Sequence, residues 1–365
     1  MDLATVVTAL AQGRNAFAAL VERIVLLPPE QLLAAGQIAL SALSARNPTP
    51  STHGAAEFKL RSKLFDVLLA QEEFFEAAST MAAMHMESVQ LPPEQAADAY
   101  IKVAETYLEL DEAVDAEVFA NKASPLMADV SDRSLELRYR TTYARVLDAN
   151  RKFLDAATRY YDVSKVSEGV DPDDLLLLLG RAVTCACLGR AGPQRTRILA
   201  QIFRDERLQS LETLEDYRDH AAVLAKMYKG QLIRRHELEG FTASLLDHQK
   251  AICEGGFTYP ERAIMEHNIE ACGKIYECIA LGEFATILGV TGSVAEGIAA
   301  KMISQGRLSA VIDQVDGFLT FEASRAGVGG AAAKSPGVFT QWDEKLTNVC
   351  RLVNTIVEDV AGRID

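Results

Sequence analysis

Two aspartates near the end of the chain could form a catalytic pair. They are Asp313 and Asp316, within the stretch GRLSAVIDQVDGFLTFE at residues 306–322. Two carboxylates can share acid and base roles or hold a divalent cation, but only if both point to one place. The Asp-Gly pair at 316 and 317 lies between alternating β-prone runs, which predicts a two-residue hairpin turn with the pairs Val315–Phe318 and Ile312–Phe321. This turn would send the two side chains in different directions, so we expect them to shape a hairpin and not to catalyse a reaction.

Histidines and cysteines, the usual ligands of zinc, are scattered along the chain. The six histidines, at positions 53, 85, 220, 236, 248 and 267, form no HxH or HExxH pair. His267, beside Asn268 on a largely apolar stretch, is interpreted as a hydrogen-bonded structural residue. The six cysteines lie in apolar contexts without CxxC spacing, and we expect them to be reduced and buried. No metal site is predicted.

A glycine-rich stretch at residues 326–337, AGVGGAAAKSPG, has a superficial likeness to a phosphate-binding loop. Ala333 stands where such a loop needs the glycine before its lysine, and the preceding strand belongs to an antiparallel hairpin. We interpret residues 323–337 as a flexible linker. Local spacing also assembles no Ser/His/Asp or Cys/His set, so the sequence predicts no catalytic residue, no cofactor and no enzyme activity.

The composition sets limits on the fold and on the partners. The chain has 365 residues, of which 49% are apolar, and this predicts either two or three domains or an extended repeat array. A net charge of -14 argues against nucleic acid or an anionic membrane as the main partner, because such binding needs concentrated Lys and Arg. The N-terminus lacks a signal-peptide pattern, and the longest apolar run, residues 175–179, is too short to span a bilayer. We expect a protein of the cytoplasm and nucleus.

A weak repeat runs along the first two thirds of the chain. Two sets of apolar residues recur at intervals of 39 residues, namely Leu69, Leu108 and Leu147, and Phe75, Val114 and Phe153, and a fourth unit arrives about two residues late. Apolar helices joined by polar turns predict an α-solenoid of TPR-like helix hairpins over residues 55–260. The alternative, chance likeness within an alanine-rich protein, also leaves the region helical. Residues 1–45 form a predicted N-terminal helical arm, and the motifs LPPE at 27 and 91 and DPDD at 171 predict helix starts.

Residues 261–322 predict a winged helix, with helix, strand, helix, helix and hairpin in that order. The first helix should bury Met265, Ile269, Cys272 and Tyr276, the strand should be YECI, and the second helix should carry Phe284, Ile287 and Leu288. The motif SVAE predicts a capping box between Ser293 and Glu296, before a helix that buries Val294, Ile298 and Met302. Winged helices often bind DNA, but residues 293–305 offer only Lys301, with Arg307 just beyond. We therefore predict no nucleic-acid partner.

A helical array running into an acidic winged helix resembles the PCI domain family of the proteasome lid, the COP-9 signalosome and initiation factor complexes. Within that family, the stretches AGPQRTRILAQIFRDERLQ, LLDHQKA, RAIMEHNI and MISQGRLSAVIDQVDGFLTFE resemble the signalosome branch most. The resemblance implies a non-catalytic scaffold subunit in a hetero-oligomer. Its partners would be other signalosome PCI and isopeptidase-type subunits and a cullin-RING ubiquitin ligase, and the complex would remove a ubiquitin-like modifier from cullins. The alternatives are a PCI subunit of the proteasome lid and a nucleic-acid-binding PCI adaptor.

Residues 338–363 predict a C-terminal assembly helix. Its apolar residues are spaced by four, three, four, three and four positions, at Trp342, Leu346, Val349, Val353, Ile356 and Val360. Such a heptad seam is typical of helices that pack against partner helices. A helix folded back on its own domain is the alternative, whereas the glycine-rich tether and the family resemblance favour contact with another subunit.

Overall fold

The computed structural model describes residues 14–321, apart from residues 46–49, 85, 87–88, 90, 167–169, 212 and 254. The chain divides into the units Met1–Phe321 and Glu322–Asp365, and all described residues belong to the first. The predicted linker and the predicted assembly helix lie outside the described residues. Among the described residues, no single helix is long and apolar enough to cross a membrane, although one bent pair, Leu281–Leu288 with Gly292–Ser304, meets the length and composition requirement together.

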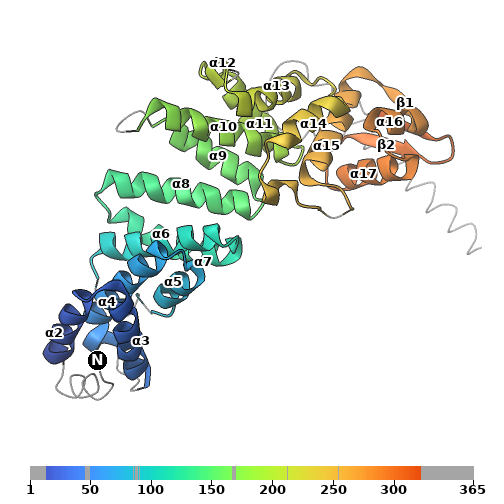
Figure 1. The fold of residues 1–365 in the computed structure, drawn as a ribbon. Coiled ribbons are helices and arrows are strands. Elements are labelled where there is room, and N and C mark those ends of the chain that lie inside the picture. Colours follow the sequence, from blue (N-terminus) through green and yellow to red (C-terminus); the bar gives the residue numbers. More distant parts are fainter. Residues whose placement is uncertain are drawn as a thin grey trace, which may run out of the picture. The chain divides into compact units, whose positions relative to one another are not determined.

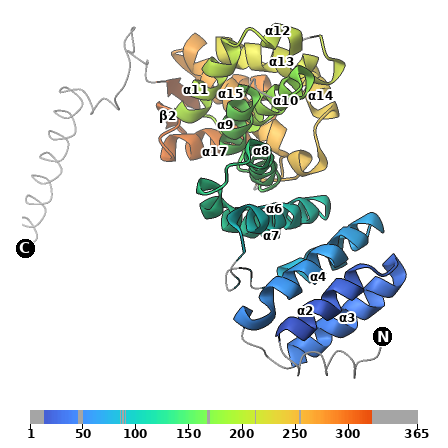
Figure 2. The ribbon, with the colours of Figure 1, turned by 90° about the vertical axis from the view of Figure 1, so that its left-hand side faces the viewer.

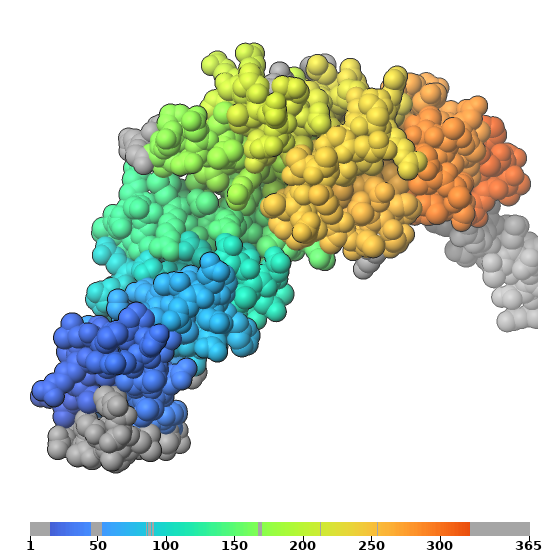
Figure 3. All heavy atoms as spheres, in the orientation of Figure 1, coloured from blue at the N-terminus to red at the C-terminus, as the bar shows by residue number. Residues whose placement is uncertain are grey.

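Helices follow one another from the N-terminal part of the chain to α14 (Figures 1 and 2). Neighbours along the chain pack together, as α4 does with α5, α6 with α7 and α8 with α9, and this confirms the predicted α-solenoid. Figure 3 shows the same order on the surface of the described residues. The helices are α2 (Arg14–Val25), α3 (Pro29–Ala45), α4 (Pro50–Ala70), α5 (Phe74–Ala82), α6 (Pro93–Glu109), α7 (Ala113–Ala123), α8 (Arg133–Ala149), α9 (Phe153–Ser164), α10 (Pro172–Leu188), α11 (Pro193–Phe203), α12 (Leu208–Leu211), α13 (Glu215–Lys229) and α14 (Arg235–Ala243), with 3-10 turns at Ser124–Ala128 and Asp247–Lys250.

Proline and aspartate fix the starts of several helices, as predicted. Helices α3, α6 and α10 each begin at a proline, where the missing N–H costs no helical hydrogen bond. The carboxylate of Asp171 accepts a hydrogen bond from the N–H of Asp173 at 3.2 Å, so this DPDD residue is a helix cap.

The repeat is visible in three turns that have the same backbone geometry. Glu72, Asp111 and Arg151 are the described non-glycine residues with positive φ, at 64°, 60° and 62°. In each turn the next N–H reaches back to a carbonyl five residues earlier, at 2.9 to 3.0 Å, which satisfies the end of the first helix. The α10–α11 connection lacks this turn and runs through Gly189 and Gly192, in agreement with the late fourth unit.

The apolar residues that follow these turns have unequal environments. Phe75 and Val114 are each 70% exposed, whereas Phe153 is 4% exposed. The rings of Phe153 and Tyr259 make a T-shaped contact, with 5.3 Å between their centroids. Equal spacing in the sequence therefore gave equal turns but unequal burial, because tertiary packing differs along the array.

The winged helix follows the array and has the predicted order of elements: α15 (Tyr259–Ile275), β1 (Cys278–Ala280), α16 (Leu281–Leu288), α17 (Gly292–Ser304), β2 (Ala310–Asp313) and β3 (Phe318–Phe321). The strands form one antiparallel sheet in the order β1-β3-β2. Its core includes Ile269, Phe284, Met302 and Leu319, together with Ala191 from the array.

The predicted hairpin register was wrong. Ile312 pairs with Leu319 and Asp313 with Phe318, so four residues, 314–317, connect the strands. The carboxylate of Asp313 accepts backbone N–H bonds from Val315 and Asp316 at 3.0 and 3.1 Å, which stabilises the wider turn. Asp316 lies in the turn, as predicted, and Asp313 is the last residue of β2.

The SVAE motif forms no capping box. Helix α17 starts at Gly292 with Thr291 at the N-cap position, so Glu296 stands too far along to reach the cap, and its carboxylate accepts a bond from Gln314 instead. The buried face of α17 is made by Ala295, Ala299 and Met302.

Three smaller expectations also need correction. The first strand begins two residues later than YECI, and Tyr276 is exposed. Cys185, Cys187 and Cys272 are buried as expected, whereas Cys278 is exposed and Cys253 is partly buried. Cys350 lies outside the described residues.

Candidate functional site: the polar junction around helix α15

Helix α15 joins the array to the winged helix. It packs against α10 and α14 on one side and against α16 and α17 on the other. Thr258 and Glu261 form a capping box that fixes its first turn, with the N–H of Thr258 donating to Glu261 Oε2 at 2.8 Å. Every residue from Ala263 to Ile269 is buried, so this part of the helix is enclosed on all sides. Its buried polar side chains therefore need partners inside the protein.

Glu266 links three segments of the chain. Its carboxylate binds the Arg307 guanidinium through two bonds, of 2.6 and 3.1 Å, and accepts the N–H of Ala191 at 3.0 Å. Ala191 follows α10 and Arg307 follows α17, so one buried carboxylate ties the array to both parts of the winged helix. Two hydrogen bonds between one guanidinium and one carboxylate fix the relative orientation of the two groups and also stabilise the contact.

A second ion pair lies one turn further along α15. Arg195 from α11 is 1% exposed and donates to Glu270 Oε2 at 2.7 Å. Its other nitrogen lies 3.4 Å from the carbonyl oxygens of Gly189 and Ala263. Moving α11 away from α15 would leave the buried charge of Arg195 unpaired, which is strongly destabilising. These contacts therefore fix the position of α11 against α15.

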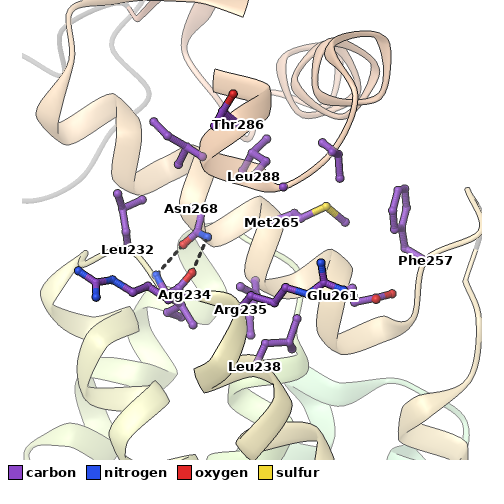
Figure 4. Close-up of a pocket in the computed structure, with 15 residues that line it drawn as sticks. Leu232, Arg234, Arg235, Leu238, Phe257, Glu261, Met265, Asn268, Thr286 and Leu288 are labelled. Carbon is purple, nitrogen blue, oxygen red and sulfur yellow. Dashed lines mark hydrogen bonds between the residues drawn. The ribbon is translucent and has the colours of Figure 1, made fainter. Parts of the chain in front are cut away.

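Asn268 holds the segment between α13 and α14. Its Oδ1 accepts the N–H of Ile233 at 2.9 Å and its Nδ2 donates to the Ile233 carbonyl at 3.0 Å (Figure 4). His267 Nε2 lies 2.9 Å from the Gln231 carbonyl oxygen and must donate to it. The structural role predicted for His267 is therefore confirmed, and the neighbouring asparagine acts with it.

Two buried histidines, His267 on α15 and His220 on α13, are held neutral. Burial lowers the pKa of His267 to about 4, and it lowers the pKa of His220 to about 4 as well. A general base needs a pKa closer to the working pH and access to a substrate. Neither histidine meets both conditions.

One arrangement that sequence spacing did not predict imitates part of a catalytic triad. Ser244 Oγ lies 2.9 Å from His220 Nε2, and Thr184 Oγ1 lies 2.7 Å from His220 Nδ1. Thr184 offers a hydroxyl to the histidine at the place where a catalytic triad has a carboxylate. The ring of His220 is also buried beside Phe241, out of reach of a substrate. We interpret this set as a structural link between α10, α13 and α14. Thr184 lies on α10, His220 on α13 and Ser244 just after α14, so no local motif could have found the set.

Metal ligands do not gather anywhere in the described part of the chain. No group of three His, Cys, Asp or Glu side chains there could hold a metal ion. The carboxylate of Asp313 is engaged by the backbone of its own turn, as described above.

An apolar cavity of about 390 Å³ opens beside Asn268 (Figure 4). It lies between the segment before α14, helix α15 and the end of α16. Glu261, the acid on its wall, is bonded to the helix cap, so the cavity offers a mainly apolar surface and no acid–base pair. Its apolar lining includes Leu232, Leu238, Phe257, Met265, Ile287 and Leu288.

The sheet of the winged helix presents a free edge. β2 is an outer strand in the order β1-β3-β2, and no other strand among the described residues pairs with its outer side. Val311 on β2 is 56% exposed and Val315 in the turn is 95% exposed. Unpaired backbone groups next to exposed apolar side chains are typical of a surface that another chain covers.

The predicted interface residues of the C-terminal helix lie outside the described residues. These are Trp342, Leu346, Val349, Val353, Ile356 and Val360. Their role stays a prediction.

Comparison with known proteins gives consistent matches along the chain. Residues 232–323 match the family described as PCI domain, and residues 55–170 match the family described as PSMD12/CSN4, N-terminal. The COP9 signalosome complex subunit 4 of Drosophila melanogaster is 35% identical over 83% of this chain and 70% of the relative. The proteins of the same name from Emericella nidulans and Arabidopsis thaliana are 33% and 34% identical over 92% and 83% of this chain, and over 80% and 74% of their own lengths.

Proposed function

Because the chain belongs to the COP9 signalosome subunit 4 family, we propose that it is a scaffold subunit of the signalosome. The observation that carries this proposal is the match to subunit 4 proteins over most of both chains. The buried junction around α15 supports it, since Glu266 and Asn268 hold the array and the winged helix in a fixed arrangement. A subunit that positions other subunits needs this kind of rigidity.

The chemistry of the complex, removal of a ubiquitin-like modifier from cullins, would belong to a partner subunit of the isopeptidase type. This chain would contribute no catalytic group. In support, His220 and His267 are buried in structural hydrogen bonds and kept neutral. The histidine spacing in the sequence also lacks the pairs that zinc isopeptidases use.

Two surfaces would hold the chain in the complex. One is the free edge of β2 with Val311 and Val315 beside it, where a strand or loop of a neighbouring subunit could extend the sheet. The other is the predicted helix at residues 338–363, whose heptad seam would pack with helices of other subunits. Both surfaces together would make assembly cooperative.

The array would contact a cullin-RING ligase. Phe75 and Val114 take equivalent places in successive hairpins and are each 70% exposed, and Val118 lies one helical turn beyond Val114. An apolar row of this kind on a solenoid supports a protein partner. The complex would act in the cytoplasm and the nucleus.

Affinity purification of the tagged full chain followed by mass spectrometry tests the proposal. We expect the other signalosome subunits in stoichiometric amount, and we expect a complex reconstituted without this chain to lose assembly and cullin processing. Recovery of proteasome lid subunits would support a lid PCI subunit instead. Recovery of RNA-export or other nucleic-acid complexes would support a nucleic-acid-binding adaptor.

A further inference from the structure

Cationic side chains gather in two adjoining cavities of this acidic protein. The first cavity, of about 500 Å³, lies over the starts of α9 and α11, and the second, of about 310 Å³, lies beside α17. Both are lined by Arg190 and Arg262, so they adjoin. We call the two together the basic groove, and its cationic residues are Arg151, Lys152, Arg190, Arg262, Lys301 and Arg307.

Several of these charges lack an acidic partner. Lys152 pairs with Glu117, and Arg307 pairs with Glu266. Within the described residues, no carboxylate pairs with Arg151, Arg190 or Arg262. The Nε of Arg262 is buried there without a hydrogen-bond partner, which is uncommon for a buried guanidinium nitrogen.

Acidic residues in the groove do not cancel this excess. The described acids that line it are Asp155 and Glu266. Glu266 is already held by Arg307 and the backbone, and Asp155 accepts a bond from Gln194 at 3.2 Å. The first turns of α9 and α11 add the partial positive charge of their free N–H groups. The groove is thus a local positive site on a chain whose net charge is -14.

The aromatic side chain of the groove is not free to stack on a base. Two guanidinium groups lie over the ring of Tyr259, with Arg262 at 4.8 Å and Arg151 at 5.5 Å from its centre. The ring of Phe153 also meets Tyr259, with a T-shaped contact at 5.3 Å between centroids. Single-stranded nucleic acid usually binds by stacking its bases on open aromatic faces, so this geometry argues against such a partner.

The second cavity is apolar between its charges. Phe257, Val294 and Ile298 line it together with Arg190, Arg262, Lys301 and Arg307. A small phosphate compound would leave this apolar wall uncovered. A peptide can place carboxylates on the arginines and an apolar side chain on the wall at the same time.

We propose that the basic groove binds an extended acidic peptide segment of a partner protein, with one apolar side chain among its acidic residues. The carboxylates would lie on Arg190, Arg262 and Arg151, and the apolar side chain would enter the cavity beside Ile298. Charge complementarity would speed the encounter and select acidic partners, and the apolar contact would fix the register. This binding activity goes beyond the scaffold function and does not depend on it.

Fluorescence anisotropy with the purified full chain tests the proposal. The probe is a fluorescein-labelled peptide of glutamate and aspartate with a single central leucine, and the control probe replaces the leucine with serine. Arg190→Glu reverses an exposed charge shared by both cavities. Arg204→Glu makes the same change at an exposed residue that lines neither cavity and is the matched control. Inorganic tripolyphosphate and a single-stranded oligonucleotide serve as competitors.

We expect Arg190→Glu to weaken binding of the leucine peptide by about tenfold or more, and Arg204→Glu to leave binding within about twofold. The serine peptide should bind several times more weakly than the leucine peptide. Equal losses for the two arginine variants, or no binding of the leucine peptide, would overturn the proposal. It would also fail if tripolyphosphate or the oligonucleotide bound more tightly than the peptide and lost that binding in Arg190→Glu. Circular dichroism of both variants checks that the fold is kept.

Discussion

Glu266 and Arg307 are separated by 41 residues of sequence, yet their carboxylate and guanidinium meet at 2.6 Å in the buried junction. The contact closes the winged helix, because Glu266 lies on its first helix and Arg307 follows its third. The same carboxylate also binds the N–H of Ala191 in the array. Loss of this one group would leave the Arg307 guanidinium without its carboxylate partner and the N–H of Ala191 without its acceptor.

Removal of either partner of this ion pair should destabilise the chain strongly. We expect Glu266→Ala or Arg307→Ala to lower the free energy of unfolding by about 3–5 kcal/mol, and the double variant to lose less than the sum. Urea denaturation followed by circular dichroism measures these values. The exposed pair Glu136 and Arg140 on α8 is the control, where Arg140→Ala should cost below about 1 kcal/mol. Equal costs at the two sites would contradict the role of the junction.

Stability should fall as the pH drops from about 6.5 towards 4. Burial holds the pKa of His220 and His267 at about 4 in the folded chain, below the usual 6.5. The unfolded chain therefore binds more protons in this window, and each histidine costs the fold about 1.4 kcal/mol per pH unit. His267→Gln keeps a donor for the Gln231 carbonyl and removes the titration, so the pH dependence of the unfolding free energy should become shallower by about one proton. An unchanged slope would show that His267 is not buried neutral.

Cysteine reactivity should follow burial and not sequence context. Cys278 on β1 is exposed, whereas Cys187 is buried and burial raises its pKa to about 12. Under native conditions we expect a maleimide to label Cys278 readily and to leave Cys185 and Cys187 unlabelled. Peptide mass spectrometry locates the label, and labelling in urea provides the control in which all cysteines react. Fast native labelling of Cys187 would show that the array opens there.

Periodicity and turn chemistry predicted the fold class well, since both act over short stretches. The repeat of 39 residues located three turns whose backbones agree, and the proline motifs located the helix starts. Details that depend on competition between neighbouring residues were less predictable. The segments TYPE at 258 and SVAE at 293 both fit the capping-box pattern, but of these two only TYPE forms the box. In the second, Thr291 takes the cap position and moves Glu296 out of reach.

The junction could not be predicted because its bonds join distant segments. Glu266, His267 and Asn268 are adjacent in the sequence, yet Glu266 binds Arg307, 41 residues later, whereas His267 and Asn268 bind Gln231 and Ile233 in the connection before α14. The one sign of the junction in the sequence was the presence of one charged and two polar residues within an otherwise apolar helical stretch. The overall charge of -14 likewise gave no information on where cationic side chains gather, because the groove residues come from distant segments of the chain.

The predicted C-terminal helix at residues 338–363 gives a further test of assembly. Polar substitutions at Leu346, Val353 and Ile356 should abolish incorporation into the complex if the seam packs against partner helices. The melting temperature of the isolated chain should then stay unchanged. If the helix packs on its own chain, the same substitutions should lower the melting temperature by several degrees, because a loss of about 1 kcal/mol shifts it by about 2–4 °C or more. A destabilised chain that still joins the complex would contradict the assembly role.

A lysine on the outer strand of the sheet should block assembly and leave the fold intact. Val311 is exposed on β2, where a charged side chain discourages another strand from pairing. We expect Val311→Lys to change the unfolding free energy by less than about 0.5 kcal/mol, since the side chain makes few contacts in the free chain. Pull-down with co-expressed signalosome subunits should show a clear loss of at least one neighbour. Leu177→Lys is the matched control, because it also replaces an exposed apolar residue with lysine, at a 45% exposed position of α10. It should leave the pull-down unchanged. If Val311→Lys retains every neighbour as the control does, the free edge of β2 is not an assembly surface.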